Sequence, residues 1–377
     1  MFPRKLVLTT LLNDANYFLF GPRATGKSSL IQEELKDALV IDLLDDDVYE
    51  ELLKRPTSLS ARLKNPQQIV VIDEIQKLPK LLDEVHRLIQ KKNIRFLLTG
   101  SSARKLKREG ANMLGGRARE IHMHPLSFSE IPRFNLIRYL NYGGLPLVYL
   151  SKEPALDLKA YVRTYLAEEI KAEAAVRNYE RFVRFLETMA LSNGQEINYA
   201  TLSSDSGVPA RTIESYIEVL KDTLVGFELV PFTKTVKRKA VTRSKFYFFD
   251  TGVANFLSER LPLAENHSEI GASFEQFMIL EIRAYISYSQ KNESLSYWRV
   301  KDCEVDLIVG KKLALEFKMS RVVKNQFFRG LKALKEENLV QKFLLIGRFS
   351  HEGVHDSGIS YMPYDVFLNK LWAGELF

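Results

Sequence analysis

The sequence has one cysteine, Cys303, in 377 residues, and this scarcity excludes a fold held together by internal disulfides. A single thiol agrees with a reducing compartment, so we expect the protein in the cytoplasm. No stretch approaches the ~20 consecutive apolar residues of a membrane-spanning helix, and we therefore expect no membrane partner. The first residues carry too short and too interrupted an apolar run for a signal peptide.

What the chain does contain is typical of an ordinary globular protein. Apolar residues make up 46% of it and charged residues 27%, which excludes a disordered chain. The length predicts two or three domains with sizeable cores. The formal net charge is +7, a modest excess that favours acidic partners such as nucleic acid.

The strongest motif lies at residues 18–30, "FLFGPRATGKSSL", which matches G-x-x-x-x-G-K-[ST]. An apolar strand precedes it and a helical run follows, as a phosphate-binding loop requires. Lys27 is expected to reach the β and γ phosphates of ATP, and Ser28 to hold Mg²⁺. The expected nucleotide contacts are Gly21, Pro22, Arg23, Ala24, Thr25, Gly26, Lys27, Ser28 and Ser29.

A second stretch, "QQIVVIDEIQKLP", has an unbroken apolar strand that ends in Asp73 and Glu74. Such runs suit a parallel strand buried on both faces. Asp73 is placed to orient the metal's water and Glu74 to activate the attacking water, although two acids at a strand end also occur as helix caps. A third strand, "IRFLLTGSS", ends in polar groups that can sense the γ-phosphate. The alternation of strands and helices up to about His124 predicts a three-layer α/β domain.

The middle of the chain begins at "YGGLP", where Gly143, Gly144 and Pro146 mark a boundary or hinge. Residues 197–232 read as a helix, a turn, a second helix and a strand, which is a winged-helix pattern. The hairpin that follows is basic, so we expect it to grip a nucleic-acid backbone without reading bases. A solvated hairpin is the alternative. The basic residues are Lys234, Lys237, Arg238, Lys239, Arg243 and Lys245.

Near the C-terminus, "EVDLIVGKKLALEFKMS" reads as two short strands joined at Gly310. Strand side chains alternate between faces, so Asp306 points away from its apolar neighbours. Glu316 and Lys318 likewise share one face of the second strand. Two carboxylates and an ammonium group can therefore converge on one side of the hairpin. They are either solvated or they form a site.

Several of these stretches resemble one protein family. "GPRATGKSS", "VVIDEIQKLP", "LLTGSSARKL", "LGGRARE" and "HPLSFSE" occur in the order found in a family of prokaryotic AAA-type ATPases. "YGGLP", "KFYFFDTGVANFL", "GASFEQF" and "EVDL…LEFK" continue that order, and the resemblance runs from about Tyr17 to Tyr364. It implies an AAA ATPase joined to a C-terminal domain of unknown function with a restriction-endonuclease-like core. One departure is Ala24, where relatives often carry Gln.

The resemblance also implies roles for residues. The D…(D/E)-x-K motif of restriction-endonuclease-like cores falls on Asp306, Glu316 and Lys318. The two carboxylates are then expected to bind Mg²⁺, and Lys318 to position the attacking water or steady the phosphate charge. Glu275 matches a family position and is expected to complete the metal site. Arg117, in "LGGRARE", is a candidate arginine finger in cis or from a neighbouring subunit, with Arg23 as its rival.

The sequence therefore predicts an α/β protein in three parts. Residues 1–134 form an AAA-type P-loop domain, residues 135–262 a helical lid and winged helix, and residues 263–377 a restriction-endonuclease-like domain. The expected function is ATP hydrolysis coupled to Mg²⁺-dependent cleavage or binding of nucleic acid, DNA rather than RNA, with a homo-oligomer possible. The rival is an ATP-driven switch that binds nucleic acid or protein and cleaves nothing.

Overall fold

The computed structural model describes residues 2–63, 65, 68–92, 94–102, 106, 114–166, 178–233, 240–265, 267 and 269–377. Within these ranges the chain forms two compact units. The first unit contains residues up to His124 together with Val219–Val225, and the second contains the rest of the described chain. The predicted domain boundaries after residues 134 and 262 stay predictions.

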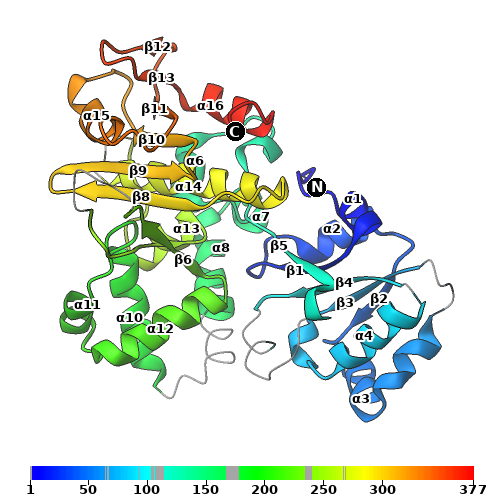
Figure 1. Cartoon of the computed structure of the whole chain (residues 1–377). Coiled ribbons are helices and arrows are strands. Elements are labelled where there is room, and N and C mark those ends of the chain that lie inside the picture. The colour runs from blue at the N-terminus through cyan, green and yellow to red at the C-terminus, as the bar shows by residue number, and fades with distance from the viewer. Residues whose placement is uncertain are drawn as a thin grey trace. The chain divides into compact units, whose positions relative to one another are not determined.

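The first unit has a five-stranded parallel sheet with the order β2-β3-β4-β1-β5 (Figure 1). Apolar runs form the three inner strands, β3, β4 and β1, because the inner strands of a parallel sheet are buried on both faces. Strand β1, for example, is buried at each of its residues. The edge strand β5 instead carries the exposed residues Arg119 and Glu120. The prediction of an α/β fold with a parallel sheet is confirmed. The strands are β1 (Asn16–Phe20), β2 (Leu39–Asp42), β3 (Ile69–Asp73), β4 (Arg95–Gly100) and β5 (Ala118–His122).

Helices connect these strands and enclose an apolar core that includes Phe18, Val70, Leu88 and Phe96. Amphipathic spacing gives α4 one buried face, and the Asp45 side chain caps the first turn of α3. The helices are α1 (Leu8–Asp14), α2 (Lys27–Glu34), α3 (Asp46–Lys54) and α4 (Leu81–Lys92). Short 3₁₀ segments span Pro56–Arg62, Ile75–Lys77 and Leu114–Gly116.

The second unit begins with a helical part. Its elements are a 3₁₀ turn (Phe128–Glu130), α6 (Leu136–Tyr142), α7 (Pro146–Leu150), α8 (Pro154–Ala160), a π-helical turn (Tyr161–Leu166), α10 (Tyr179–Leu191), α11 (Tyr199–Ser206), α12 (Ala210–Asp222) and α13 (Thr251–Leu257). The last turn of α12, from Val219 on, belongs to the first unit. Gly207 adopts a left-handed conformation after α11, and the Asn198 side chain caps that helix.

Helix α12 is followed by an antiparallel pair of strands, β6 (Gly226–Pro231) and β7 (Lys245–Phe248). An isolated antiparallel bridge joins Glu196, between α10 and α11, to Lys245. The predicted apolar face of α12 is buried at Ile213, Tyr216 and Ile217. The elements therefore follow the predicted order of helix, turn, helix and strand.

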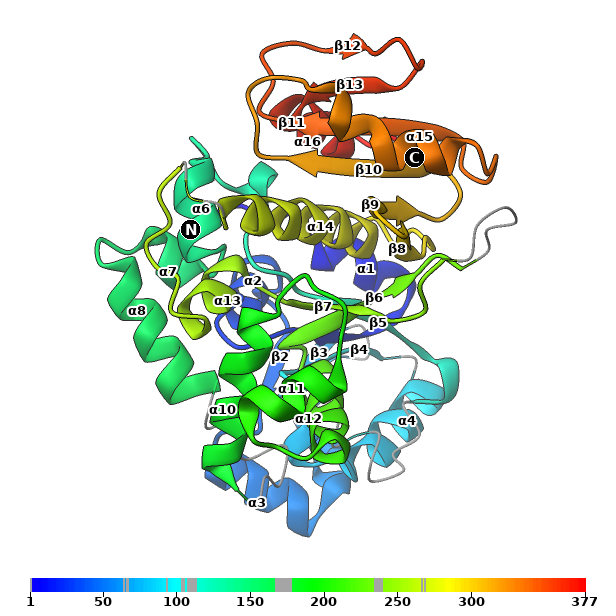
Figure 2. The same cartoon turned by 90° about the vertical axis from the view of Figure 1, so that its left-hand side faces the viewer.

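Strands β6 and β7 end an eight-stranded sheet whose order is β12-β13-β11-β10-β9-β8-β6-β7. The helix α14 contacts β10 and the helix α15 contacts β9; Figure 2 shows α14 running along the sheet. The remaining elements are α14 (Ile270–Tyr288), β8 (Leu295–Val300), β9 (Cys303–Val309), β10 (Leu313–Lys318), a 3₁₀ turn (Asn325–Phe328), α15 (Arg329–Lys335), β11 (Lys342–Gly347), β12 (Gly353–Val354), β13 (Ser360–Pro363) and α16 (Tyr364–Trp372).

Strands β9 and β10 form the predicted antiparallel hairpin, with Gly310 in a left-handed conformation at the turn. Strands β10 and β11 pair in parallel. In the parts of the chain that the structure describes, no helix has the length and hydropathy needed to cross a bilayer.

The "YGGLP" segment is fixed by a buried carboxylate. Gly144 N donates a hydrogen bond of 2.8 Å to Asp250 Oδ2, and Asp250 also caps α13. Gly143 has φ 75° and ψ −170°, a conformation that L-residues with side chains rarely adopt. A Cβ on Gly143 would lie 1.9 Å from Asp250 Oδ1. The glycine is therefore required both by the backbone and by the close approach of Asp250.

We expect Gly143→Ala to lower the free energy of unfolding by about 2 kcal/mol or more, because the strain and the clash with Asp250 add. Gly271→Ala is the matched control, since a Cβ there meets no atom of the described residues within 4 Å and alanine favours the helix. Urea unfolding followed by circular dichroism measures both. Equal midpoints for the two variants would contradict the expectation.

Candidate functional site

The glycine-rich loop lies between β1 and α2 in the first unit. Lys27 is the first residue of α2 and is buried. Its Nζ donates to Gly21 O at 2.6 Å and to Pro22 O at 3.2 Å. Gly26 and Ala24 have positive φ, 98° and 61°, so the loop curls back over the start of the helix. The loop therefore has the form that wraps phosphates in backbone N–H groups, with an ammonium group held inside it.

Asp73 is the last residue of β3 and Glu74 follows it, and β4 lies between that strand and β1. The ends of parallel strands meet at one edge of the sheet, so these acids share the carboxyl edge with the glycine-rich loop. Thr99 Oγ1, at the end of β4, donates to Asp73 Oδ1. Gln76 Nε2 donates to Glu74 Oε2 and, at 3.2 Å, to Ser101 Oγ.

Glu74 itself is held in an unusual state. It has φ 58°, a left-handed conformation that costs a non-glycine residue energy and often marks functional positions. Glu74 occupies the cap position of the next 3₁₀ turn, yet its side chain makes no capping bond there. Burial raises its pKa; Lys27 opposes this and Asp73 adds to it. The carboxyl group is therefore poised to accept a proton.

The two candidate arginines differ in position. Arg117 is exposed and immediately precedes β5, and its carbonyl accepts from Asn16 Nδ2 at 3.0 Å, at the start of β1. It therefore lies at the amino edge of the sheet, and the glycine-rich loop follows the carboxyl end of β1, roughly 13 Å along the strand. This geometry opposes a finger role for Arg117 in cis and leaves the neighbouring-subunit alternative. Arg23, in the loop, has an electrostatic effect on the Glu74 carboxylate.

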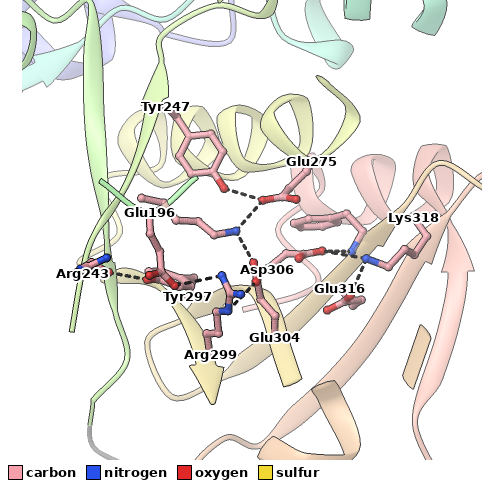
Figure 3. A network of polar contacts seen from close by, with 12 residues as sticks. Glu196, Arg243, Tyr247, Glu275, Tyr297, Arg299, Glu304, Asp306, Glu316 and Lys318 are labelled. Carbon is pink, nitrogen blue, oxygen red and sulfur yellow. Dashed lines mark hydrogen bonds and ion pairs between the residues drawn. The ribbon is translucent and has the colours of Figure 1, made fainter. Parts of the chain in front are cut away.

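The second unit contains a cluster of charged side chains (Figure 3). Its side chains come together because residues two apart on a strand face the same side of the sheet. Strand β7 contributes Lys245 and Tyr247, β9 Glu304 and Asp306, and β10 Glu316 and Lys318. Helix α14 adds Glu275. We call these residues the carboxylate cluster: Lys245, Tyr247, Glu275, Glu304, Asp306, Glu316 and Lys318.

The predicted triad comes together within this cluster. Lys318 Nζ lies 2.6 Å from Glu316 Oε1 and 3.9 Å from Asp306 Oδ2. Asp306 Oδ2 also accepts from Phe317 N at 2.7 Å. Asp306 and Glu316 are only 4% and 7% exposed, which excludes the alternative that the carboxylates are merely solvated.

Burial sets the charge state of this triad. It raises the pKa of Asp306 and, more strongly, the pKa of Glu316, where the neighbouring Asp306 raises it further. Burial works against the Lys318 ammonium, but the two carboxylates overcome it and raise its pKa. Within the part of the chain that the structure describes, Glu316 Oε2 is buried and has no hydrogen-bond partner. A buried oxygen of this kind is costly unless a proton or a cation joins it.

Glu275 has other partners. Its Oε1 accepts from Tyr247 O–H at 2.6 Å and from Lys245 Nζ at 3.2 Å. Lys245 Nζ also pairs with Glu304 Oε1 at 2.5 Å. The sequence predicts Lys245 as one of the basic residues of a hairpin that contacts nucleic acid or solvent, but Lys245 is buried, with 4% of its surface exposed. Period-two spacing could have revealed Glu304 beside Asp306, whereas nothing local to Lys245 indicated its carboxylate partners.

The chemistry of the carboxylate oxygens fits one hard divalent cation at Asp306 and Glu316, because Glu316 Oε2 is an orphaned buried acceptor. In the described part of the chain no group of three acidic, histidine or cysteine side chains is placed to hold one ion. Glu275 therefore does not join Asp306 and Glu316 in a ready-made site. Its carboxylate is engaged with Lys245 and Tyr247 instead.

A polar cavity of about 510 Å³ adjoins the cluster, and Glu275, Glu304, Arg243 and Arg299 are among the residues that line it. Arg243 is exposed, and its predicted contact with nucleic acid stays a prediction. The other predicted contacts, Lys234, Lys237, Arg238 and Lys239, lie outside the described residues.

Three family models match successive parts of the chain. Residues 13–132 match a family model described as an AAA domain. Residues 133–264 match "Domain of unknown function (DUF8612)", and residues 270–365 match "Domain of unknown function (DUF4143)". The N-terminal match supports the predicted AAA-type ATPase part. The descriptions of the two other family models state no function.

Relatives extend over most of the chain. An uncharacterized protein of Mycobacterium tuberculosis is 28% identical over 314 residues, 80% of this chain and 69% of that protein. An uncharacterized protein of Methanocaldococcus jannaschii is 25% identical over 404 residues, 95% of this chain and 87% of that protein. Both relatives are uncharacterized, so they indicate no activity for this chain.

Solved structures are similar only weakly. The Pif1 helicase from Candida albicans is 14% identical with a TM-score of 0.23, over 42% of this chain and 46% of that one. Protein VC1899 from Vibrio cholerae is 12% identical with a TM-score of 0.21, over 95% and 96%. Likenesses at this level carry no argument about fold or function.

Proposed function

We propose that the chain hydrolyses ATP in its first unit. One observation carries this proposal: the buried Lys27 ammonium, inside the glycine-rich loop, shares the carboxyl edge of the sheet with Asp73 and Glu74. The similarity of residues 13–132 to an AAA domain supports it. Mg²⁺ would be held by Ser28 and, through water, by Asp73, and would neutralise charge on the phosphates.

The residues around the bound phosphates have distinct tasks in this proposal. On binding ATP, Lys27 Nζ exchanges the carbonyls of Gly21 and Pro22 for phosphate oxygens. Glu74 accepts the proton of the attacking water, and Gln76 orients the Glu74 carboxylate through its amide. Thr99, at the end of β4, positions Asp73. Polar groups of three adjacent strand ends therefore act on one reacting phosphate.

A general base must be ionised, so the raised pKa of Glu74 predicts that kcat falls on acidification sooner than it would with an unperturbed glutamate. The Gln76 hydrogen bond lowers this pKa. We therefore expect Gln76→Leu to move the acid limb of the kcat profile to higher pH and to leave the plateau above it. Phosphate release from pH 5 to 9 measures this. Gln90→Leu, at an exposed position, is the control; identical acid limbs for wild type and Gln76→Leu would refute the role of Gln76.

For the second unit, we propose Mg²⁺-dependent cleavage of phosphodiester bonds at Asp306, Glu316 and Lys318. The observation that carries it is the buried carboxylate pair with an orphaned oxygen at Glu316 and an ammonium group beside it. The element order of α14, three strands, α15 and β11 agrees with a restriction-endonuclease-like core. When bound, Mg²⁺ would supply Lewis-acid stabilisation of the phosphate. Lys318 would orient the attacking water and stabilise charge on the phosphate oxygens.

We further propose nucleic acid, DNA in preference to RNA, as the partner. The order of α10 to α12 followed by β6 and β7, with the Glu196–Lys245 bridge, supports a winged helix. The basic segment from Lys234 to Arg243 would then contact the backbone. Exposed Glu214 and Glu218 on α12 repel phosphate, which argues against reading of bases in a groove.

The proposed function is tested with purified protein, Mg²⁺ or Mn²⁺, and labelled single- and double-stranded DNA and RNA, with and without ATP. Phosphate release and strand cleavage are followed together. ATP turnover with strand cleavage supports the whole proposal. ATP turnover without cleavage of any substrate supports the rival, an ATP-driven switch whose second unit only binds. The absence of turnover overturns the ATPase assignment.

A further inference from the structure

Two lysines divide the carboxylate cluster into two halves of the same composition. In one half, Lys318 lies between Glu316 and Asp306, at 2.6 and 3.9 Å. In the other half, Lys245 Nζ lies 2.5 Å from Glu304 Oε1 and 3.2 Å from Glu275 Oε1. Each half therefore holds two carboxylates and one ammonium group.

The halves differ in whether an acceptor remains open. In the Lys318 half, Glu316 Oε2 is buried and accepts no hydrogen bond from any described residue. In the Lys245 half, Glu275 Oε1 accepts from both Lys245 and Tyr247. The Lys245 side chain is only 5% exposed, and its Nζ lies 5.2 Å from the centre of the Tyr297 ring. Lys245 is thus enclosed on several sides at the position where a cation between Glu275 and Glu304 would lie.

The net charge of the cluster also indicates a single cation. Four carboxylates and two ammonium groups leave two negative charges when all of them are ionised. Arg299 pairs with Glu196 at 3.3 Å, and its Nε also lies 3.7 Å from Glu304 Oε2. The opposite charges of Glu196 and Arg299 leave the net charge of the cluster unchanged. One divalent cation therefore completes the charge of the cluster, and a second would leave it with an uncompensated positive charge in a buried place.

We propose that Lys245 takes the place of a second metal ion, so that the cluster binds a single hard divalent cation at Asp306 and Glu316. This inference rests on the cation site of the proposed function. Strand β7, which precedes the C-terminal domain predicted from the sequence, thereby supplies a fixed charge to the site. Glu275, predicted from the sequence to be a metal ligand, instead serves to hold Lys245.

The test counts bound Mn²⁺ in nucleotide-free protein from the electron paramagnetic resonance signal of free Mn²⁺. Sites that persist in Glu316→Gln are subtracted as background. We expect one Mn²⁺ in the wild type and still one in Glu275→Gln, because Glu275 is not a ligand. In Lys245→Met, Glu275 and Glu304 lose the ammonium group that they share, while Glu304 keeps its contact with Arg299 at 3.7 Å. Both acids line the adjoining cavity, so we expect one additional Mn²⁺.

Lys312→Met is the control, because Lys312 forms an ion pair with Glu293 outside the cluster at 2.6 Å. Lys245→Gln, which keeps an N–H donor, replaces Lys245→Met if that variant does not fold. Three results would overturn the role of Lys245 alone. These are two bound Mn²⁺ in the wild type, loss of Mn²⁺ in Glu275→Gln, or no additional Mn²⁺ in the Lys245 variant. No Mn²⁺ above background in the wild type overturns the proposed cation site as well.

Discussion

We expect Lys27→Ala to lower ATP turnover by on the order of 100-fold or more while the protein remains folded. The Lys27 ammonium is the positive charge held inside the glycine-rich loop, and the loop sequence GPRATGKSS has no second lysine to replace it. Alanine is a good helix former at the start of α2, so the variant keeps the local structure. Phosphate release at saturating ATP measures the effect.

Lys91→Ala is the matched control, because it removes an exposed ammonium from the last turn of α4 in the same unit. Its turnover should equal that of the wild type. Thermal unfolding of both variants tests whether either has lost its fold. Turnover of folded Lys27→Ala at the wild-type rate would show that ATP is hydrolysed elsewhere or by contamination.

The fold of the first unit was predictable because its signals are local. Unbroken apolar runs mark β1, β3 and β4, and the glycine-rich motif fixes the junction of β1 and α2. The end of that helix was less predictable, because the sequence indicates a helical run after the loop but not where it stops. Leu35 leaves the helical conformation, with φ −117° and ψ 51°, so α2 ends at Glu34, before β2 begins at Leu39.

The candidate sites show a similar limit. Alternation along two adjacent strands was enough to predict that Asp306, Glu316 and Lys318 converge. The partners of Glu275 were not predictable, because Lys245 lies 30 residues earlier and reaches it only through the arrangement of β7 and α14. Arg117 shows the converse, since its motif suggested a finger but strand direction places it at the amino edge of the sheet.

We expect Glu316→Gln to abolish metal-dependent strand cleavage, a loss on the order of 100-fold or more, and to leave ATP turnover unchanged. The substitution keeps the shape of the side chain but removes a carboxylate oxygen that a cation needs. It should not destabilise the second unit, because burial raises the Glu316 pKa and so penalises the ionised side chain. Cleavage of labelled DNA with Mg²⁺ or Mn²⁺ measures the loss.

Glu352→Gln is the control for this variant, since it removes an exposed carboxylate that pairs with Lys370 at 2.8 Å. It should cleave like the wild type. A folded Glu316→Gln protein that cleaves normally would exclude Asp306, Glu316 and Lys318 as the catalytic centre. If cleavage is lost in Glu316→Gln but persists in Lys27→Ala, then the second unit cleaves without ATP hydrolysis. If both variants lose it, hydrolysis in the first unit controls the carboxylate cluster.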